Sequence, residues 1–176
     1  MPNSEAKGDH MKSLSPYKIL WLLPIIFAIH NLEELWLLED WVKTFTNDRK
    51  FAFIKNFYRF ETLAFAMILL TLAGAVIIFF AYRKQSNITF HLMILCNSLL
   101  FINSLTHLGQ FFLFRKYVPG LLSAVILMMP FTFYTLFLYI KNKSITPKMA
   151  AVYLGISVLA MGPIIIIFLV ISKLFT

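Results

Sequence analysis

Three ionisable side chains lie close together near the amino-terminal end of the chain, in the segment "IHNLEELWLLEDW". They follow the stretch "YKILWLLPIIFA", which is apolar enough to cross a membrane as a helix. At about 100° per residue, Glu33 lies about 60° to one side of His30 and Glu34 about 40° to the other. The three groups therefore share one stripe of a helix. Because charge inside a membrane is costly, we expect this stripe to face the interior of a helix bundle rather than lipid.

A second polar stripe follows in a later apolar segment. Its members recur at the i, i+3, i+4, i+7 spacing of a single helical face: Asn103, Thr106, His107 and Gln110. The remaining faces of this segment are rich in Leu and Phe. Two polar stripes in one small apolar bundle are most readily satisfied by facing each other. We therefore expect the helix that carries His30 to lie against the helix that carries His107.

The depth of the two histidines in the membrane agrees with this pairing. His30 lies eight residues before the expected end of its span at Leu38, and His107 lies eight residues before Arg115. At a rise of about 1.5 Å per residue, both lie roughly 12 Å inside one membrane boundary. We call the membrane side at which the first span starts side A and the opposite side side B. Both histidines are then expected in the side-B half.

Two imidazoles and neighbouring carboxylates form a ligand set for a divalent transition metal such as Zn or Fe. A His-x-x-Glu spacing places both groups on one helical face, and carboxylate-bridged metal bundles use the reverse order, Glu-x-x-His. Glu61 begins the next span at side B, so its carboxylate approaches from the same end. The candidate metal ligands are His30, Glu34, Glu61 and His107. The candidate catalytic residues are Glu33, Glu34 and Asn103.

Two other interpretations of these residues stay open. One is a metal-free network in which His30 and His107 pair with glutamates and fix the packing of the helices. The other is a path for protons or ions, because chains of acidic residues and histidines occur in transporters. The first would serve a non-catalytic protein and the second a proton-coupled carrier.

The composition predicts that the elements positioning these residues are membrane helices. Sixty per cent of the 176 residues are hydrophobic and 14% are charged, against about 45–50% and about 25% in soluble domains. The net charge of +8 comes from basic residues clustered between apolar runs, as in loops that flank a membrane. We therefore expect membrane lipids, and no nucleic acid, as partners. The single cysteine, Cys96, excludes an intramolecular disulfide.

Five apolar stretches are long enough to span a bilayer, which takes about 20 residues. They are roughly 18–38, 60–82, 88–114, 118–140 and 148–173. Continuous apolar runs of this length argue against the alternating pattern of a membrane barrel. The sequence thus predicts an all-α membrane protein, a bundle of five transmembrane helices over residues 18–176 behind a polar N-terminal tail over 1–17. The long connection, 39–59, is expected either to lie in the interface or partly to extend the second span.

With these residues identified, the chain resembles the HXXEE-domain family of small polytopic membrane proteins. "HNLEE" at 30–34 matches the signature of that family, and "NSLTH" at 103–107 and "YVPG" at 117–120 look like its later motifs. The resemblance extends from about 18 to 140. It implies functional roles for His30, Glu33, Glu34, Asn103 and His107, with Tyr117, Pro119 and Gly120 behind them. It implies no particular reaction.

These observations together predict a multi-pass protein of the cell membrane with a polar pocket in its side-B half. The leading hypothesis is a metal-dependent enzyme that acts on a lipid or another hydrophobic small molecule. A metal-free isomerase that shuttles protons through the same His and Glu residues is a variant of this hypothesis. The alternatives are the proton-coupled carrier and the non-catalytic protein with a structural polar core.

Overall fold

The computed structural model describes residues 16–46 and 59–176, and within these ranges the regular structure is helical throughout. The helices follow one another as α1 (Pro16–Leu20), α2 (Leu23–Thr46), α3 (Phe60–Lys84), α4 (Asn87–Phe114), α5 (Leu121–Ser123), the π-helical turn η2 (Ala124–Met128), α6 (Met129–Lys141) and α7 (Pro147–Lys173). Residues 1–15, which make up most of the expected N-terminal tail, lie outside the described residues.

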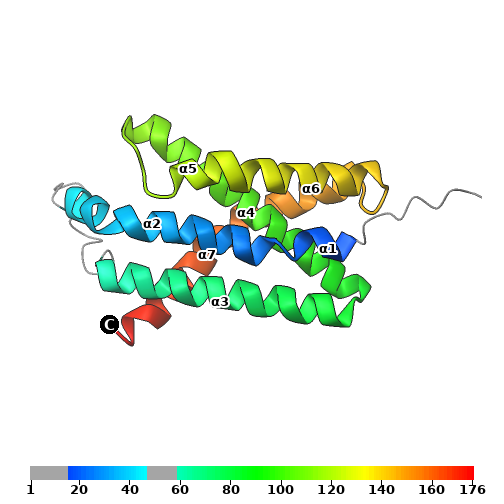
Figure 1. Cartoon of the computed structure of the whole chain (residues 1–176), viewed down its shortest axis with the longest axis horizontal. Helices are drawn as coiled ribbons and strands as arrows, with labels where there is room; N and C mark the ends of the chain where they lie inside the picture. Colours follow the sequence, from blue (N-terminus) through cyan, green and yellow to red (C-terminus); the bar gives the residue numbers. More distant parts are fainter. Residues whose placement is uncertain (1–15, 47–58) are drawn as a thin grey trace, which may run out of the picture.

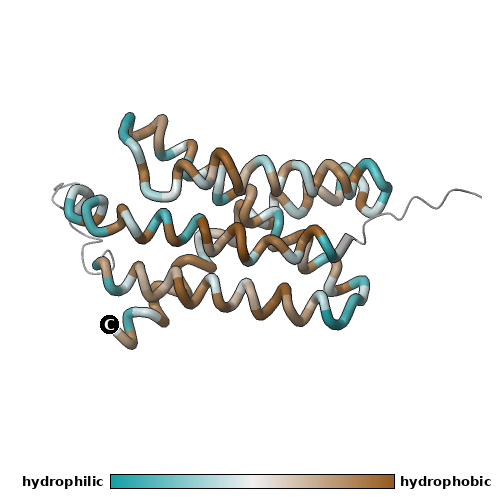
Figure 2. The backbone as a smooth tube through the Cα atoms, in the orientation of Figure 1, coloured by the Kyte–Doolittle hydropathy of each residue, from teal (hydrophilic) through white to brown (hydrophobic). Residues whose placement is uncertain are grey.

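Five helical segments of the described chain are long and apolar enough to cross a membrane. They are Lys18–Thr44, Phe60–Lys84, Asn87–Phe114, Leu121–Lys141 and Pro147–Lys173. The first joins α1 to α2, and the fourth joins α5, η2 and α6. Hydrophobic residues, coloured brown, run along the middle of the helices, and hydrophilic residues, coloured teal, gather at several of the helix ends (Figure 2). The predicted all-α bundle of five transmembrane helices is therefore confirmed, and the chain is a multi-pass membrane protein.

The spans run side by side with α4 at the centre of the bundle (Figure 1). Helix α4 crosses behind α2 and packs against α3, α6 and α7. Helix α2 packs against α3 on one side and against α5 and η2 on the other. The Ser172 hydroxyl donates a 2.6 Å hydrogen bond to the carbonyl of Thr62. This contact places the end of α7 beside the start of α3, so α7 ends at side B.

Helix α2 continues eight residues beyond the expected end of the first span at Leu38. Its last turns contain an exposed i, i+4 ion pair, Lys43 Nζ to Glu39 Oε1 at 2.7 Å, of the kind that supports a solvated helix. The helix end therefore lies beyond the apolar run and does not mark the membrane boundary. The remainder of the long connection, residues 47–58, lies outside the described residues.

Short connections with defined caps fix the order of the helices. Ser86 and Thr89 form a capping box that starts α4 directly after α3, satisfying backbone donors that the first helical turn leaves free. At the other end, Arg115 closes α4 in a left-handed conformation with φ of 51°. The loop that follows is buried at Val118, Pro119 and Gly120. It folds back into the bundle and starts α5 against α2.

A buried amide ties α4 to the second half of the fourth span. Asn97 Nδ2 donates to the carbonyl of Thr132 at 3.0 Å, and Asn97 Oδ1 accepts from Thr135 Oγ1 at 2.8 Å. All three residues are buried. Because unpaired polar groups are expensive away from water, such a fully paired set fixes how the two helices lie against each other.

Candidate functional site

His30 is fully buried in the middle of the bundle and is hydrogen-bonded at both ring nitrogens. Asn103 Nδ2 lies 3.2 Å from Nε2, and Ser123 Oγ lies 3.0 Å from Nδ1. Since an amide nitrogen only donates, this arrangement assigns the free electron pair to Nε2 and the proton to Nδ1. Ser123 Oγ then donates to the carbonyl of Gly120 at 3.3 Å. A chain of contacts from three spans thus orients one imidazole.

Glu34 and His107 complete a cluster around Nε2 of His30. Glu34 Oε2 lies 3.6 Å from His30 Nε2 and 3.9 Å from His107 Nε2. The two imidazole rings meet edge to face, with centroids 4.7 Å apart and planes at 79°. The structure therefore brings together the polar stripes of α2 and α4, as their spacing in the sequence indicated.

The spacing of these atoms suits a small divalent ion. One donor atom from each of His30, Glu34 and His107 lies within 4.8 Å of the other two. Nitrogen and oxygen ligands about 2.0–2.2 Å from a tetrahedral zinc ion are roughly 3.3–3.6 Å apart. The Glu34–His30 distance of 3.6 Å meets this spacing, and the Glu34–His107 distance of 3.9 Å exceeds it by about 0.3 Å. His107 Nδ1 is buried with no hydrogen-bond partner among the described residues, but it is not the nitrogen nearest Glu34 and so adds nothing to the ligand set.

Glu33 holds the loop before α5. Its Oε1 accepts from the Tyr117 hydroxyl and, at 3.1 Å, from the backbone N–H of Leu122. Its Oε2 accepts from the backbone N–H of Ser123 at 2.7 Å. A carboxylate at the first N–H groups of a helix satisfies free donors and interacts favourably with the helix dipole. The two adjacent glutamates of "HNLEE" therefore have different surroundings.

Tyr117 stays protonated in this arrangement at neutral pH. It lies in the loop between two spans, where partial burial and then its hydrogen bond to Glu33 raise the pKa of the phenol above its ordinary value. A protonated phenol can donate to the carboxylate. Tyr117 and two backbone N–H groups thus fix the position of Glu33.

Gly120 allows the loop to touch both histidine rings. Its φ of 78° lies in the left-handed region, and a Cβ there would stand 2.7 Å from His30 Cε1 and 3.1 Å from His107 Cε1. Any other residue would therefore meet strain in the backbone and collision with the site. In the sequence this residue was indicated only by the family resemblance.

Glu61 is not brought to the cluster. Its side chain is exposed at the start of α3, and its Oε2 lies 3.7 Å from Nε of Arg59. Among the described residues, the group that could hold a metal ion consists of His30, Glu34 and His107. The catalytic roles expected of Glu33, Glu34 and Asn103 stay predictions, because no bound molecule shows which groups touch a substrate.

Ser123 belongs to the site but was missed in the sequence. It bonds to both His30 and Glu33, through its hydroxyl and its backbone N–H respectively. Its one signal was a lone serine inside the apolar run "LLSAVILMM", three residues after Gly120. Serine is common in membrane helices as a packing residue, so this signal is not specific.

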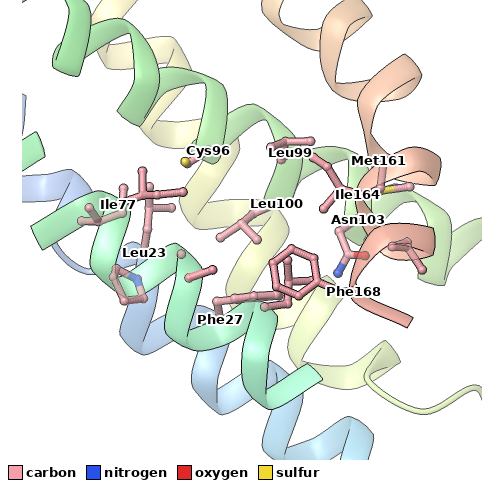
Figure 3. Close-up of a pocket in the computed structure, with 16 residues that line it drawn as sticks. Leu23, Phe27, Ile77, Cys96, Leu99, Leu100, Asn103, Met161, Ile164 and Phe168 are labelled. Atoms are coloured by element: carbon pink, nitrogen blue, oxygen red, sulfur yellow. The ribbon is translucent and has the colours of Figure 1, made fainter. Parts of the chain in front are cut away.

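An apolar cavity of about 290 Å³ adjoins the cluster. It is lined from four spans, by residues of α2, α3, α4 and α7. Figure 3 shows Cys96 and Ile77 towards one end and Asn103 beside Phe168 and Ile164 towards the other. Asn103 therefore belongs to both the cavity and the cluster, because its side chain lines the cavity and bonds to His30.

The fold and the site define a small polytopic membrane protein with a buried His–Glu cluster between its spans. The chain belongs to the HXXEE family, since the model for "Protein of unknown function with HXXEE motif" matches residues 21–135. The matched region runs from the start of the first span into α6 and contains the whole site. No curated protein and no solved structure matches the chain.

Proposed function

We propose that this protein is a metal-dependent enzyme of the cell membrane that acts on a lipid or another hydrophobic small molecule. His30, Glu34 and His107 hold a divalent transition metal, Zn or Fe. The observation that carries the proposal is the position of Glu34 Oε2, 3.6 Å and 3.9 Å from the Nε2 atoms of two buried histidines. Two neutral imidazoles and one carboxylate are ligands of the kind that these metals take.

Three ligands favour catalysis over a structural role for the metal. Structural zinc sites are closed by four protein ligands, whereas catalytic sites keep one position for water or substrate. A metal bound here would lower the pKa of a bound water to about 7 and polarise a substrate oxygen. Hydrolysis, isomerisation and oxidation all fit this chemistry.

The chain's own residues would orient the reactants. The Ser123 hydroxyl accepts the Nδ1 proton of His30 and so directs Nε2 towards Glu34, as partners of metal-bound histidines commonly do. Asn103 stands between His30 and the apolar cavity, where its amide can bind a polar group of a substrate. Glu33 keeps the loop of Tyr117 and Gly120 against the rings and acts as a positioning residue.

The test is the metal content of the purified protein. The parent, His30→Ala and Glu34→Ala would be purified in detergent, supplied with Zn or Fe, desalted and measured by inductively coupled plasma mass spectrometry. Glu61→Ala and His91→Ala are matched controls, because both residues lie outside the cluster. We expect about one equivalent of metal in the parent and both controls, and its loss in the two site variants. A well-folded parent protein that binds no metal would contradict the proposal.

The second candidate is a metal-free polar network, in a carrier or in a non-catalytic protein. One observation favours it: the amide nitrogen of Asn103 already lies within hydrogen-bond distance of His30 Nε2, the atom that would bind the metal. In a non-catalytic protein, the double variant His30→Leu with His107→Leu would stay folded and functional in cells. In a carrier or an enzyme, the same variant would remain folded and lose its function.

A further inference from the structure

The apolar cavity between α2, α3, α4 and α7 has dimensions that fit a chain molecule. On α4 its lining runs from Cys96 to Asn103, and on α3 from Leu70 to Ile78, which correspond to lengths of about 10 and 12 Å along the helix axes. A cavity of about 290 Å³ is at the lower end of the roughly 300–1,000 Å³ of small-molecule sites, so it suits a single hydrocarbon chain rather than a partner helix.

The lining of the cavity is polar at one end only. Asn103 is the single amide among sixteen lining residues, which are otherwise aliphatic, aromatic or sulfur-containing, apart from Gly74. Helix α4 runs from side A to side B, so Asn103 lies about 10 Å nearer to side B than Cys96 does. Asn103 lies twelve residues before Arg115, or roughly 18 Å inside side B, so the cavity reaches the middle of the bilayer. A molecule bound there would have its polar group at Asn103 and its hydrocarbon chain towards Cys96.

We propose that this cavity binds the hydrocarbon chain of a single-chain amphipathic lipid, such as a fatty acid, and places its polar group at Asn103, beside His30. That such a lipid is the substrate rests on the proposed function. That the cavity binds its chain does not, because the cavity is lined by residues other than the three proposed metal ligands.

Affinity for such a lipid comes from the polar end and from close packing. Lipid tails are as apolar as the cavity wall, so moving a chain from the bilayer into the cavity gains no hydrophobic free energy. A hydrogen bond from Asn103 inside an apolar surrounding is the interaction that distinguishes the site from bulk lipid. Replacing Asn103 by leucine is therefore expected to weaken binding although the cavity keeps its apolar lining.

Gly74 offers a way to fill the cavity without disturbing its wall. It lines the cavity, and a Cβ added there meets no atom within 4 Å. Gly74→Phe therefore extends a ring into the empty space. Gly155→Phe is the matched control, because Gly155 is equally open but lies outside the lining. Both variants place the same side chain in a membrane helix.

The experiment is photolabelling in phosphatidylcholine vesicles doped with a long-chain fatty acid that carries a diazirine on its chain. After illumination, labelled peptides are mapped by mass spectrometry and metal is measured in the same samples. We expect labelling within residues 96–103 of the parent and of Gly155→Phe, and at least about tenfold less in Gly74→Phe, a difference of about 1.4 kcal/mol. Asn103→Leu is expected to lose label as well.

A second measurement avoids variants altogether. Cys96 is the only cysteine of the chain and lines the cavity, so a bound lipid chain should slow its reaction with a membrane-permeant maleimide when protein in detergent receives the fatty acid. Equal labelling of parent and Gly74→Phe, or no protection of Cys96, would overturn the inference. Cavity labelling in a parent that holds no metal would keep the chain site and remove the metal proposal, so the two failures are distinguishable.

Discussion

The variant Gly120→Ala places a methyl group where the loop before α5 touches both histidines. Its Cβ would stand 2.7 Å from His30 Cε1, and ordinary contact begins at 3.4 Å, so ring and loop must separate by about 0.7 Å. The left-handed φ of 78° adds about 1–2 kcal/mol for a residue with a side chain. Overpacking of a close contact typically adds about 1–3 kcal/mol.

We therefore expect Gly120→Ala to lower the free energy of unfolding by about 2–5 kcal/mol, which corresponds to roughly 4–20 °C in melting temperature for a chain of this size. Metal ligands tolerate displacements of only about 0.2 Å, so metal affinity should fall by about 10–100-fold. Both quantities are measured in detergent, by thermal unfolding and by metal titration.

The control is Gly155→Ala, at an open helical position where a Cβ meets nothing within 4 Å. Removing a mid-helix glycine there should leave stability unchanged or raise it by up to about 1 kcal/mol. If Gly120→Ala melts and binds metal like the parent, the close approach of this loop to the rings is not a feature of the protein in solution.

Two further variants test the supports of the site. Tyr117→Phe removes one of three donors to Glu33 and should cost about 1–2 kcal/mol. Because the folded state raises the pKa of Tyr117, this contribution is complete below about pH 10, the unfolded value, and is lost only as pH rises through the folded value. Melting of parent and variant should differ equally at pH 7 and pH 9, and converging curves over that range would contradict the assignment. Asn97→Leu removes the bonds to α6 and should cost about 0.6–1.7 kcal/mol. Its metal content should equal that of the parent, and loss of metal would show that the α4–α6 contact also shapes the site.

The number of spans and their pairing could be predicted from the sequence, because both depend on periodicities that a bilayer enforces. Apolar runs predict the membrane helices, and polar residues at helical spacing predict which helix faces pack against each other. The helical spacing of their polar residues pairs the helices of His30 and His107. The family model covers both positions with its match over residues 21–135.

The different contacts of Glu33 and Glu34 could not be predicted in the same way. They lie on the same stripe of α2, yet one caps a helix start and the other approaches two imidazoles. Whether Glu33 or Glu34 meets the helix start depends on where the loop of Gly120 folds back. The position of that loop is set by contacts between residues far apart in the sequence. Glu61 was expected near the site from its membrane side alone, but sharing a membrane side does not fix its distance from the site within the bundle.

Helix α2 continues past the expected end of the first membrane span at Leu38, because hydropathy reports the lipid boundary and not the end of a helix. Residues such as Glu39 and Lys43 stop an apolar run but continue an α-helix through their i, i+4 pair. Depth estimates that use the end of an apolar run are therefore estimates of membrane position, and only capping residues report where the helix ends.

The π-helical turn between Ser123 and Thr132 has a consequence for the rotational phase of the fourth span. In an unbroken α-helix, nine residues turn the chain by about 900°, so these two side chains would point in opposite directions. The turn at Ala124–Met128 carries an i to i+5 bond, Met129 N–H to the carbonyl of Ala124. It accommodates one additional residue and so shifts the phase by about 100°. Before the turn the Ser123 hydroxyl contacts His30 on α2, and after it the carbonyl of Thr132 accepts from Asn97 on α4, so the turn joins the half of the span that serves the site to the half that serves the packing of the bundle.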